Sequence, residues 1–173
     1  HSLAVRRNDA IWTDYIHFEN NHFGVVSAHW VMEHLSNPVH FLEWARHRLV
    51  NGGILLVTIP NDFSSLQEDA AFILGRPHYW IHRTHVNYWP ALDFSPFIRR
   101  HGFEVLYTYG SWEPERYLLA GQNYLDDPEL GRKLHTERKQ WDLELTRDNR
   151  TKKYLELGAA GLGRDCTFVC VRR

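Results

Sequence analysis

The sequence predicts an α/β fold in which a mostly parallel sheet carries helices on both faces. Two apolar runs, residues 23–31 and 54–60, have the β-branched and aromatic content of buried strands. Between them, residues 38–50 carry apolar side chains at helical spacing. A strand, a helix and a second strand at this spacing predict a right-handed βαβ unit, whose two strands are parallel.

The composition is that of a single globular domain, which we expect to span residues 1–173. With 43% hydrophobic and 24% charged residues, the chain is neither disordered nor collagen-like. Its 20 basic and 21 acidic side chains are interspersed, which predicts no surface for nucleic acid. The longest apolar run is far shorter than the roughly 20 residues that span a bilayer, and the first residues show no signal-peptide pattern. We therefore expect a cytoplasmic protein without a nucleic-acid or membrane partner.

The first predicted helix has clear boundaries. Asn37 is placed as its N-cap, with Pro38 at the first helical position. The Asn-Gly-Gly sequence at residues 51–53 ends the pattern. The following run, residues 54–60, is apolar on both faces, which is typical of a parallel strand covered by helices on each side.

The second half of the chain continues the alternation of helix and strand. Residues 91–101 predict a helix that ends at Gly102, and residues 103–109 predict a strand. A helical insertion is expected at about residues 114–157, with one mostly polar helix running from Asp127 through Lys153. The chain closes with a strand over residues 166–171.

The two cysteines lie in this last strand. In an extended segment, Cys166 and Cys170 point to the same face and stand roughly 13 Å apart. A disulfide between them is excluded at that distance. We expect two buried free thiols.

Three motif segments follow one another along the chain. They are residues 23–38 (FGVVSAHWVMEHLSNP), 49–61 (LVNGGILLVTIPN) and 77–89 (PHYWIHRTHVNYW), the last with Gly102–Phe103 downstream. In order and spacing they resemble class I S-adenosylmethionine-dependent methyltransferases, specifically the type 11 and type 12 methyltransferase domain group. The resemblance implies a partial Rossmann-like methyltransferase fold. It also implies methyl transfer from S-adenosylmethionine to a small-molecule or sugar-like acceptor.

The family's glycine-rich cofactor loop has no counterpart among the recognised segments. In the family, this loop follows the first strand, and an acidic residue ending the second strand holds the cofactor ribose. Only 22 residues precede Phe23, too few for two strands and two helices. The glycines of residues 158–163 follow a helical segment and lead into a strand, so they indicate a helix C-cap and a turn. We expect an N-terminally truncated domain that does not bind the cofactor alone.

The resemblance implies three cofactor-binding residues. Ser27 and His29, near the end of the first strand, are expected beside the methionine part of the cofactor, since ligands bind beyond the carboxyl ends of such strands. Asp14 is expected to accept a hydrogen bond from the adenine amino group. The alternatives are that the two strand residues only satisfy backbone groups and that Asp14 is an ordinary loop residue.

The acceptor side is expected on the turn after the first strand and on the segment after the second. His34, with Glu33, matches the family's Glu-His pair and is a candidate catalytic residue, a structural role being the alternative. His85 is the candidate general base, because an imidazole of near-neutral pKa can take a proton from the acceptor. The aromatic side chains expected to bind the substrate are Tyr79, Tyr88 and Trp89.

The histidines of the same segment are also candidates for a metal site. His78, His82 and His85 have spacings that would suit one face of a helix. However, Pro77 indicates a loop, and no carboxylate or cysteine follows at a ligand spacing. The sequence therefore predicts no metal.

Two rival functions remain open. The first is a non-catalytic remnant or interaction module that forms homo-oligomers through its exposed sheet edge. The second is an oxidoreductase of the nucleotide-binding α/β class, which shares the sheet. The missing nicotinamide fingerprint disfavours the oxidoreductase.

Overall fold

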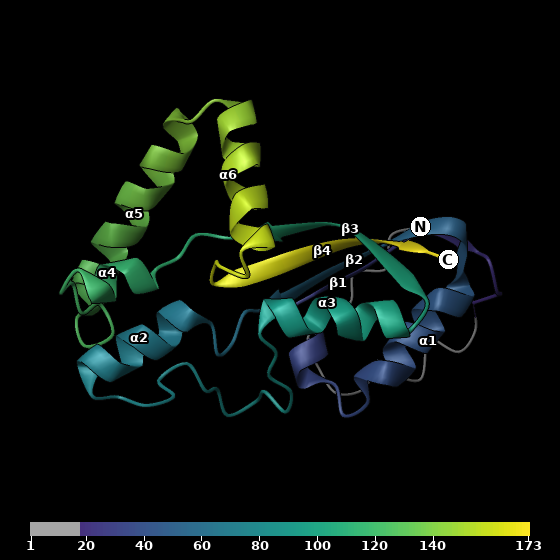
Figure 1. Ribbon diagram of the computed structural model, residues 1–173, viewed down its shortest axis with the longest axis horizontal. Helices are drawn as coiled ribbons and strands as arrows, with labels where there is room; N and C mark the ends of the chain where they lie inside the picture. Colours follow the sequence, from purple (N-terminus) through teal and green to yellow (C-terminus); the bar gives the residue numbers. More distant parts are fainter. Residues whose placement is uncertain (1–17) are drawn as a thin grey trace.

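The computed structural model describes residues 18–173, and Figure 1 shows their arrangement. The predicted strand, helix, strand order of the first half is confirmed. In chain order the elements are β1 (Phe23–His29), the short 3₁₀ helix η2 (Met32–His34), α1 (Pro38–Arg48), β2 (Leu49–Pro60), α2 (Ser65–Leu74), α3 (Ala91–Arg100), β3 (Phe103–Gly110), α4 (Glu115–Leu119), α5 (Pro128–Glu144), α6 (Arg147–Ala159) and β4 (Asp165–Arg172).

The four strands form one mixed sheet in the order β1-β2-β4-β3. β1 and β2 are parallel, as predicted, with Val26 opposite Leu55. β4 is antiparallel to both of its neighbours, so three strands share a direction and one is reversed. The reversal follows from the path of the chain. After β3 the helical segment stays at the carboxyl end of the sheet, and the next strand must run back from there (Figure 1).

The hydrophobic core lies on one face of the sheet, beneath α1 and α3. Because side chains alternate along a strand, Leu55, Val57 and Ile59 all point to this face, and each is fully buried. Burying an apolar side chain of this size stabilises the fold by roughly 1.5–3 kcal/mol. Cys166 and Cys170 are free and belong to the same core, as predicted, and burial raises the pKa of each thiol to about 12.

The second face of the sheet is covered only at its carboxyl end, by α6. Helix α6 approaches β3 so closely that a Cβ on Gly158 would lie 2.1 Å from the backbone oxygen of Thr108, which requires glycine. Elsewhere this face leaves Val25 and Tyr107 more than half exposed. The expectation of helices on both faces is thus met, with unequal cover.

The helical insertion is divided where the sequence suggested one helix. The single helix from Asp127 through Lys153 is wrong, because α5 ends before Leu145, whose backbone is extended. The side chain of Thr146 then accepts a hydrogen bond from the backbone nitrogen of Asn149 and caps α6.

Helix α2 was not predicted, although the sequence carries its signal. Ser64 and Gln67 form a capping box at its start. Gly75 ends the helix with a φ of 61°, in the left-handed region that favours glycine. A serine followed three residues later by glutamine was the pattern that could have revealed it.

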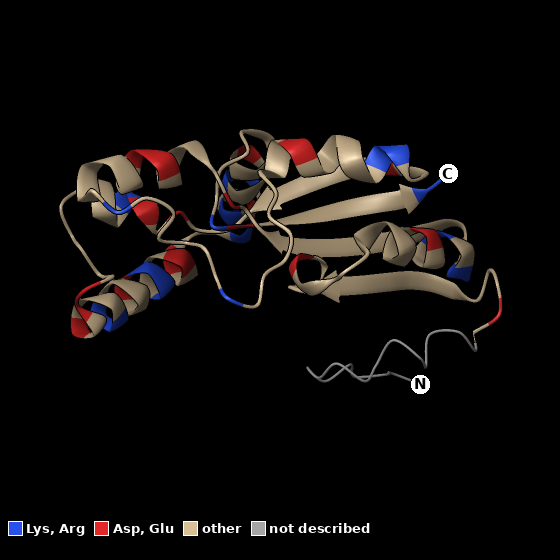
Figure 2. Ribbon diagram, turned by 90° about the horizontal axis from the view of Figure 1, so that it is seen from below, with Lys and Arg blue, Asp and Glu red and all other residues tan. Residues whose placement is uncertain are grey.

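Charged side chains gather on the helices and loops. In Figure 2 the strands are almost free of charge, while acidic and basic residues alternate along the helices. Within residues 18–173, no helix has the length and apolar character that crossing a membrane requires.

A buried ion network joins the end of β2, helix α4 and the start of β4. The Arg164 guanidinium lies 3.6 Å from Asp62 and 3.9 Å from Glu115, whose side chains are 2% and 3% exposed. Burial raises the pKa of Asp62 to about 6 and also raises the pKa of Glu115, while Arg164 opposes both shifts. Arg164 is therefore the cation on which two buried carboxylates depend.

Removing this cation should destabilise the fold in a pH-dependent way. We expect Arg164→Ala to lower the free energy of unfolding at pH 7.5 by about 3 kcal/mol, the low end for a broken buried pair, because Arg164 is one-third exposed. Without Arg164 both carboxyl groups bind protons more readily, so the deficit should shrink as the pH falls towards 5. Urea unfolding at several pH values measures this difference in the free energy of unfolding. Arg173→Ala, which breaks an exposed pair with Glu104, should cost far less, and equal losses in the two variants would refute the account.

Candidate functional site

The ends of all four strands meet at the carboxyl edge of the parallel pair. The backbone nitrogen of Trp30 donates to the oxygen of Thr58 (2.9 Å), and the nitrogen of Ser111 donates to Asp165 (2.7 Å). Asn61 likewise donates to Arg164 (2.9 Å). These bonds fix the loops that leave the sheet, at the edge where open α/β sheets bind ligands.

A cleft of about 390 Å³ opens at this edge, on the second face of the sheet. Its lining residues come from all four strands, the loops at their ends and α6: His29, Trp30, Thr58, Tyr109, Gly110, Ser111, Tyr154, Asp165 and Thr167. His29 Nδ1 lies 2.7 Å from Thr58 Oγ1, which in turn lies 2.8 Å from Thr167 Oγ1. A chain of hydrogen bonds therefore crosses β1, β2 and β4 on the floor of the cleft.

Trp30 forms one wall of the cleft in an unusual conformation. Its φ is 52°, which bulky side chains rarely adopt. Its indole nitrogen donates to Asp165 (3.1 Å), while the side chain is about half exposed. Such backbone strain costs of order 1–3 kcal/mol and concentrates at functional sites.

A second group of polar side chains, the Glu33–His34–His85 cluster, joins η2 to the segment before α3. The His34 and His85 rings stand 4.8 Å apart, edge to face. His34 Nε2 lies 3.8 Å from Glu33 Oε1. His85 is far from Glu33 and His34 in the sequence, and hydrogen bonds hold the two segments together.

Those hydrogen bonds tie residues 84–87 to the η2 turn. The backbone nitrogens of Val86 and Asn87 both donate to the oxygen of Glu33. The Asn87 side chain donates to the backbone oxygens of Met32 (3.2 Å) and Leu35 (2.6 Å). His34 Nδ1 also lies 2.9 Å from the backbone oxygen of Thr84, so bonds to backbone groups of both segments position the cluster.

The cluster contains polar atoms without partners. Glu33 is 2% exposed, and its Oε2 is buried without a hydrogen bond, so burial raises the pKa of this carboxyl. His85 Nδ1 is also buried and unpartnered. Burial lowers the pKa of His85, and the neighbouring His34 and His82 lower it further. These surroundings favour the neutral form of the His85 imidazole.

The predicted site residues divide between these two places. His29 lines the cleft, and Ser27 lies exposed two residues earlier on the same face of β1. His34 and His85 meet in the cluster, with the Tyr88 ring 5.9 Å from that of His85. Asp14 lies outside the described residues.

The remaining two aromatic residues have other surroundings. Trp89 packs on Phe94 and Phe97 at the edge of the core. The buried hydroxyl of Tyr79 faces the charge of Glu115. Their roles in binding a substrate stay predictions.

Of the nine residues that line the cleft, sequence reasoning named only His29 as a site residue. Thr58 is a polar residue within an apolar strand, a signal that could have found it. Asp165 and Trp30 gave no such signal, because their meeting depends on β4 lying beside β2.

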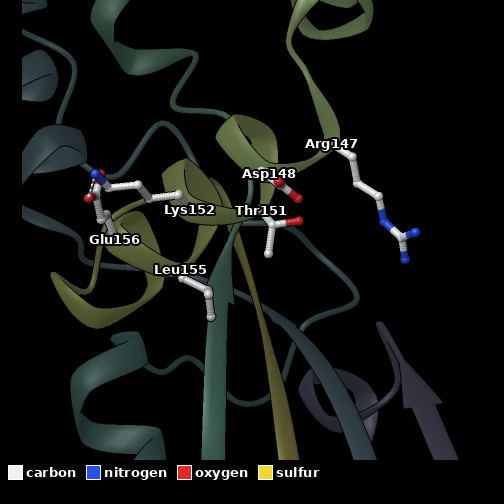
Figure 3. A pocket seen from close by; sticks show the side chains of 6 residues that line it. All are labelled: Arg147, Asp148, Thr151, Lys152, Leu155 and Glu156. Atoms are coloured by element: carbon white, nitrogen blue, oxygen red, sulfur yellow. Dashed lines mark ion pairs between the residues drawn. The ribbon is translucent and has the colours of Figure 1, made fainter.

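A larger hollow, of about 580 Å³, lies on the outer surface of α6 (Figure 3). All of its lining residues belong to that single helix: Arg147, Asp148, Thr151, Lys152, Leu155 and Glu156. Lys152 and Glu156 form an exposed ion pair there. The surface of one helix cannot enclose a ligand, so this hollow lacks the form of a binding site.

Comparison with known proteins gives one family match. Residues 4–108 match the family model of a methyltransferase domain. A search of curated proteins finds no match.

Two similar solved structures share the fold at low sequence identity. A SAM-dependent methyltransferase from Thermotoga maritima, described as a possible histamine N-methyltransferase, is 12% identical with a TM-score of 0.51, and the match covers 91% of this chain and 60% of that one. A SAM-dependent methyltransferase from Archaeoglobus fulgidus is 12% identical with a TM-score of 0.51, covering 92% and 64% respectively. This chain thus spans less than two thirds of either protein.

The hydrogen bonds of Asn87 should decide whether the cluster keeps its shape. We expect Asn87→Ala to lower the free energy of unfolding by about 1–3 kcal/mol, because the backbone oxygens of Met32 and Leu35 each lose one donor. Hydrogen exchange at the amides of Val86 and residue 87 should quicken. Gln140→Ala, which removes one exposed bond to Glu144, serves as the control and should change little. Unchanged exchange in the Asn87 variant would show that other contacts hold the segment.

Proposed function

The chain belongs to the methyltransferase domain family, and from this premise we propose that it forms part of an S-adenosylmethionine-dependent methyltransferase acting on a small-molecule or sugar-like acceptor. The fold is the Rossmann-like fold of its methyltransferase neighbours, with a mixed sheet. The observation that carries the proposal is the family match, together with the cleft and the cluster at the ligand-binding edge of the sheet.

The cleft fits part of such a cofactor. It joins aromatic surfaces of Trp30 and Tyr109 to the polar chain that begins at His29. We assign His29 and Ser27 to the methionine part of the cofactor and Asp14 to its adenine. When bound, S-adenosylmethionine supplies the methyl group from its sulfonium. The glycine-rich loop and the ribose-binding acid are proposed to lie outside this chain.

The cluster supplies groups for the acceptor. The half-buried imidazole of His85, whose pKa is lowered by burial, can accept the proton of an acceptor hydroxyl as the new bond to the methyl carbon forms. Its ring is kept in place by His34 and by Tyr88, whose hydroxyl donates to the backbone oxygen of His82 (2.9 Å). Tyr88 is placed to contact the acceptor, while Tyr79 and Trp89 are proposed as more distant contacts. The absence of nucleic-acid partners and the cytoplasmic location stay predictions.

A second candidate is an interaction module, and one observation favours it. Among the described residues, β1 pairs on one side only, and the uncovered part of the second face exposes Val25 and Tyr107. An open edge of this kind pairs readily with another chain. Sedimentation at micromolar concentration, combined with a methyl-transfer assay, discriminates the two functions. A homo-oligomer that transfers no methyl group supports the interaction module.

The affinity of the 173-residue chain for the cofactor tests whether part of the cofactor site lies outside this chain. We expect S-adenosylmethionine to bind with a Kd no tighter than about 1 mM, because much of the expected contact surface is not supplied by this chain. Isothermal titration calorimetry measures it directly. Micromolar binding would show that these residues complete the pocket in another way.

Loss of the proposed base tests the acceptor side. In the longest natural chain that contains this sequence, His85→Ala should lower kcat at least about 100-fold, the lower bound for a positioned base, and leave cofactor affinity nearly unchanged. His78→Ala, in the same segment but outside the cluster, is the matched control and should keep its turnover. Near-normal turnover of the His85 variant on the true acceptor would make His85 a structural residue.

A further inference from the structure

The Glu33–His34–His85 cluster has the composition and spacing of a metal site. Each residue offers one ligand atom, and these atoms all lie within 4.8 Å of one another. The sequence offers His78, His82 and His85 as candidate ligands. In the folded chain, His85 instead lies beside Glu33 and His34. We infer that Glu33, His34 and His85 bind a divalent transition-metal cation.

The hydrogen bonding of His34 leaves the right nitrogen free. Its Nδ1 lies 2.9 Å from the backbone oxygen of Thr84, which can only accept, so Nδ1 carries the proton. In the neutral ring, Nε2 then has an unshared electron pair, and it is Nε2 that lies 3.8 Å from Glu33. A histidine that donates its other nitrogen to a backbone carbonyl is the common arrangement around protein-bound metals.

The unpartnered atoms of the cluster are suited to binding a cation. Only 2% of the surface of Glu33 is exposed, and its Oε2 makes no hydrogen bond. Leaving a buried carboxylate unpaired is costly. A structural pair with protonated His34 would engage only Oε1 and would leave Oε2 and the buried Nδ1 of His85 without partners. One cation between the three side chains gives each of them a partner.

Binding an ion requires the three side chains to close around it. Ligand bonds of about 2.1 Å at tetrahedral angles place two ligands of one ion about 3.4 Å apart, so separations of up to 4.8 Å must shrink by as much as about 1.4 Å, which side-chain rotation can supply. The backbone bonds from Val86 and Asn87 already hold the two segments in register. Two imidazoles and one carboxylate suit Zn²⁺, Fe²⁺ or Mn²⁺ and leave a position open. His34 is 38% exposed, so the open side faces solvent.

A consequence for catalysis rests on the proposed function. A cation held here would bind the acceptor oxygen and lower its pKa, so that the proton passes to solvent before the methyl group arrives. In that case His85 acts as a ligand and its imidazole takes no proton. The metal site itself does not depend on this step.

Zinc binding to the 173-residue chain tests the site without any methyl transfer. We expect ZnCl₂, titrated in competition with a chromophoric chelator, to bind one ion per chain at this site and to raise Tm. The variants Glu33→Gln, His34→Ala and His85→Ala should each bind at least about tenfold more weakly, since even the loss of an outer partner of a ligand costs 10- to 100-fold. His78→Ala is the matched histidine control and should bind as the wild type does.

A folding defect is separated from a lost ligand by the metal-free proteins. Glu33→Gln removes a buried unpaired charge, so without zinc its Tm should equal or exceed that of the wild type. A lower metal-free Tm combined with unchanged zinc affinity would mean that Glu33 is structural. Absence of tight zinc binding to the wild type, or equal losses in the His78 variant, would overturn the site. If zinc binds as expected but turnover ignores chelators, the site stands and its catalytic role is wrong.

Discussion

The parallel pairing of β1 with β2 is the constraint on which the rest of the structure depends. It places the carboxyl ends of both strands at one edge, so that the loops that leave them meet. His29 and Thr58 thereby share a hydrogen bond, and the η2 turn after β1 receives the backbone donors of residues 86 and 87. β4 extends the same edge by starting where β2 ends, which brings Asp165 to the indole of Trp30. The cleft and the cluster both follow from this one arrangement.

The carboxyl edge of the sheet buries charged side chains, and the rest of the sheet buries apolar ones. The opposite end of the sheet and the core beneath α1 and α3 are filled by apolar side chains, whereas the carboxyl edge buries the carboxylates of Glu33, Asp62 and Glu115. Arg164 compensates two of these, and Glu33 has no equivalent partner. Its carboxyl lies within the electrostatic influence of Asp62 and Asp165, so the cluster, the ion network and the cleft form one electrostatic neighbourhood. Buried polar groups without partners are rare in folded proteins, so the unsatisfied oxygen of Glu33 calls for a functional explanation.

The sequence was sufficient for elements set by local signals. Apolar runs and the Asn37–Pro38 start predicted β1, α1 and β2, and the thiols of Cys166 and Cys170 lie in the core as expected. The sequence could not predict the reversed direction of β4, because that direction depends on the end of the sheet at which the preceding helices place the start of the strand. The break at Leu145 was missed for the opposite reason, since charged residues on both sides suit a continuous helix. His34 and His85 were proposed from the family resemblance, but their contact with each other and with the buried Glu33 is a long-range result of folding.

The central claim is that the carboxyl edge holds the cofactor and the acceptor side by side. A crystal structure of the longest natural chain containing this sequence, with S-adenosylhomocysteine, tests it most directly. We expect the sulfur of the ligand to lie against the end of β1, beside His29, with the Glu33–His34–His85 cluster on the acceptor side. A ligand bound on the face covered by α1 and α3, or one that makes no contact with the end of β1, would contradict the account.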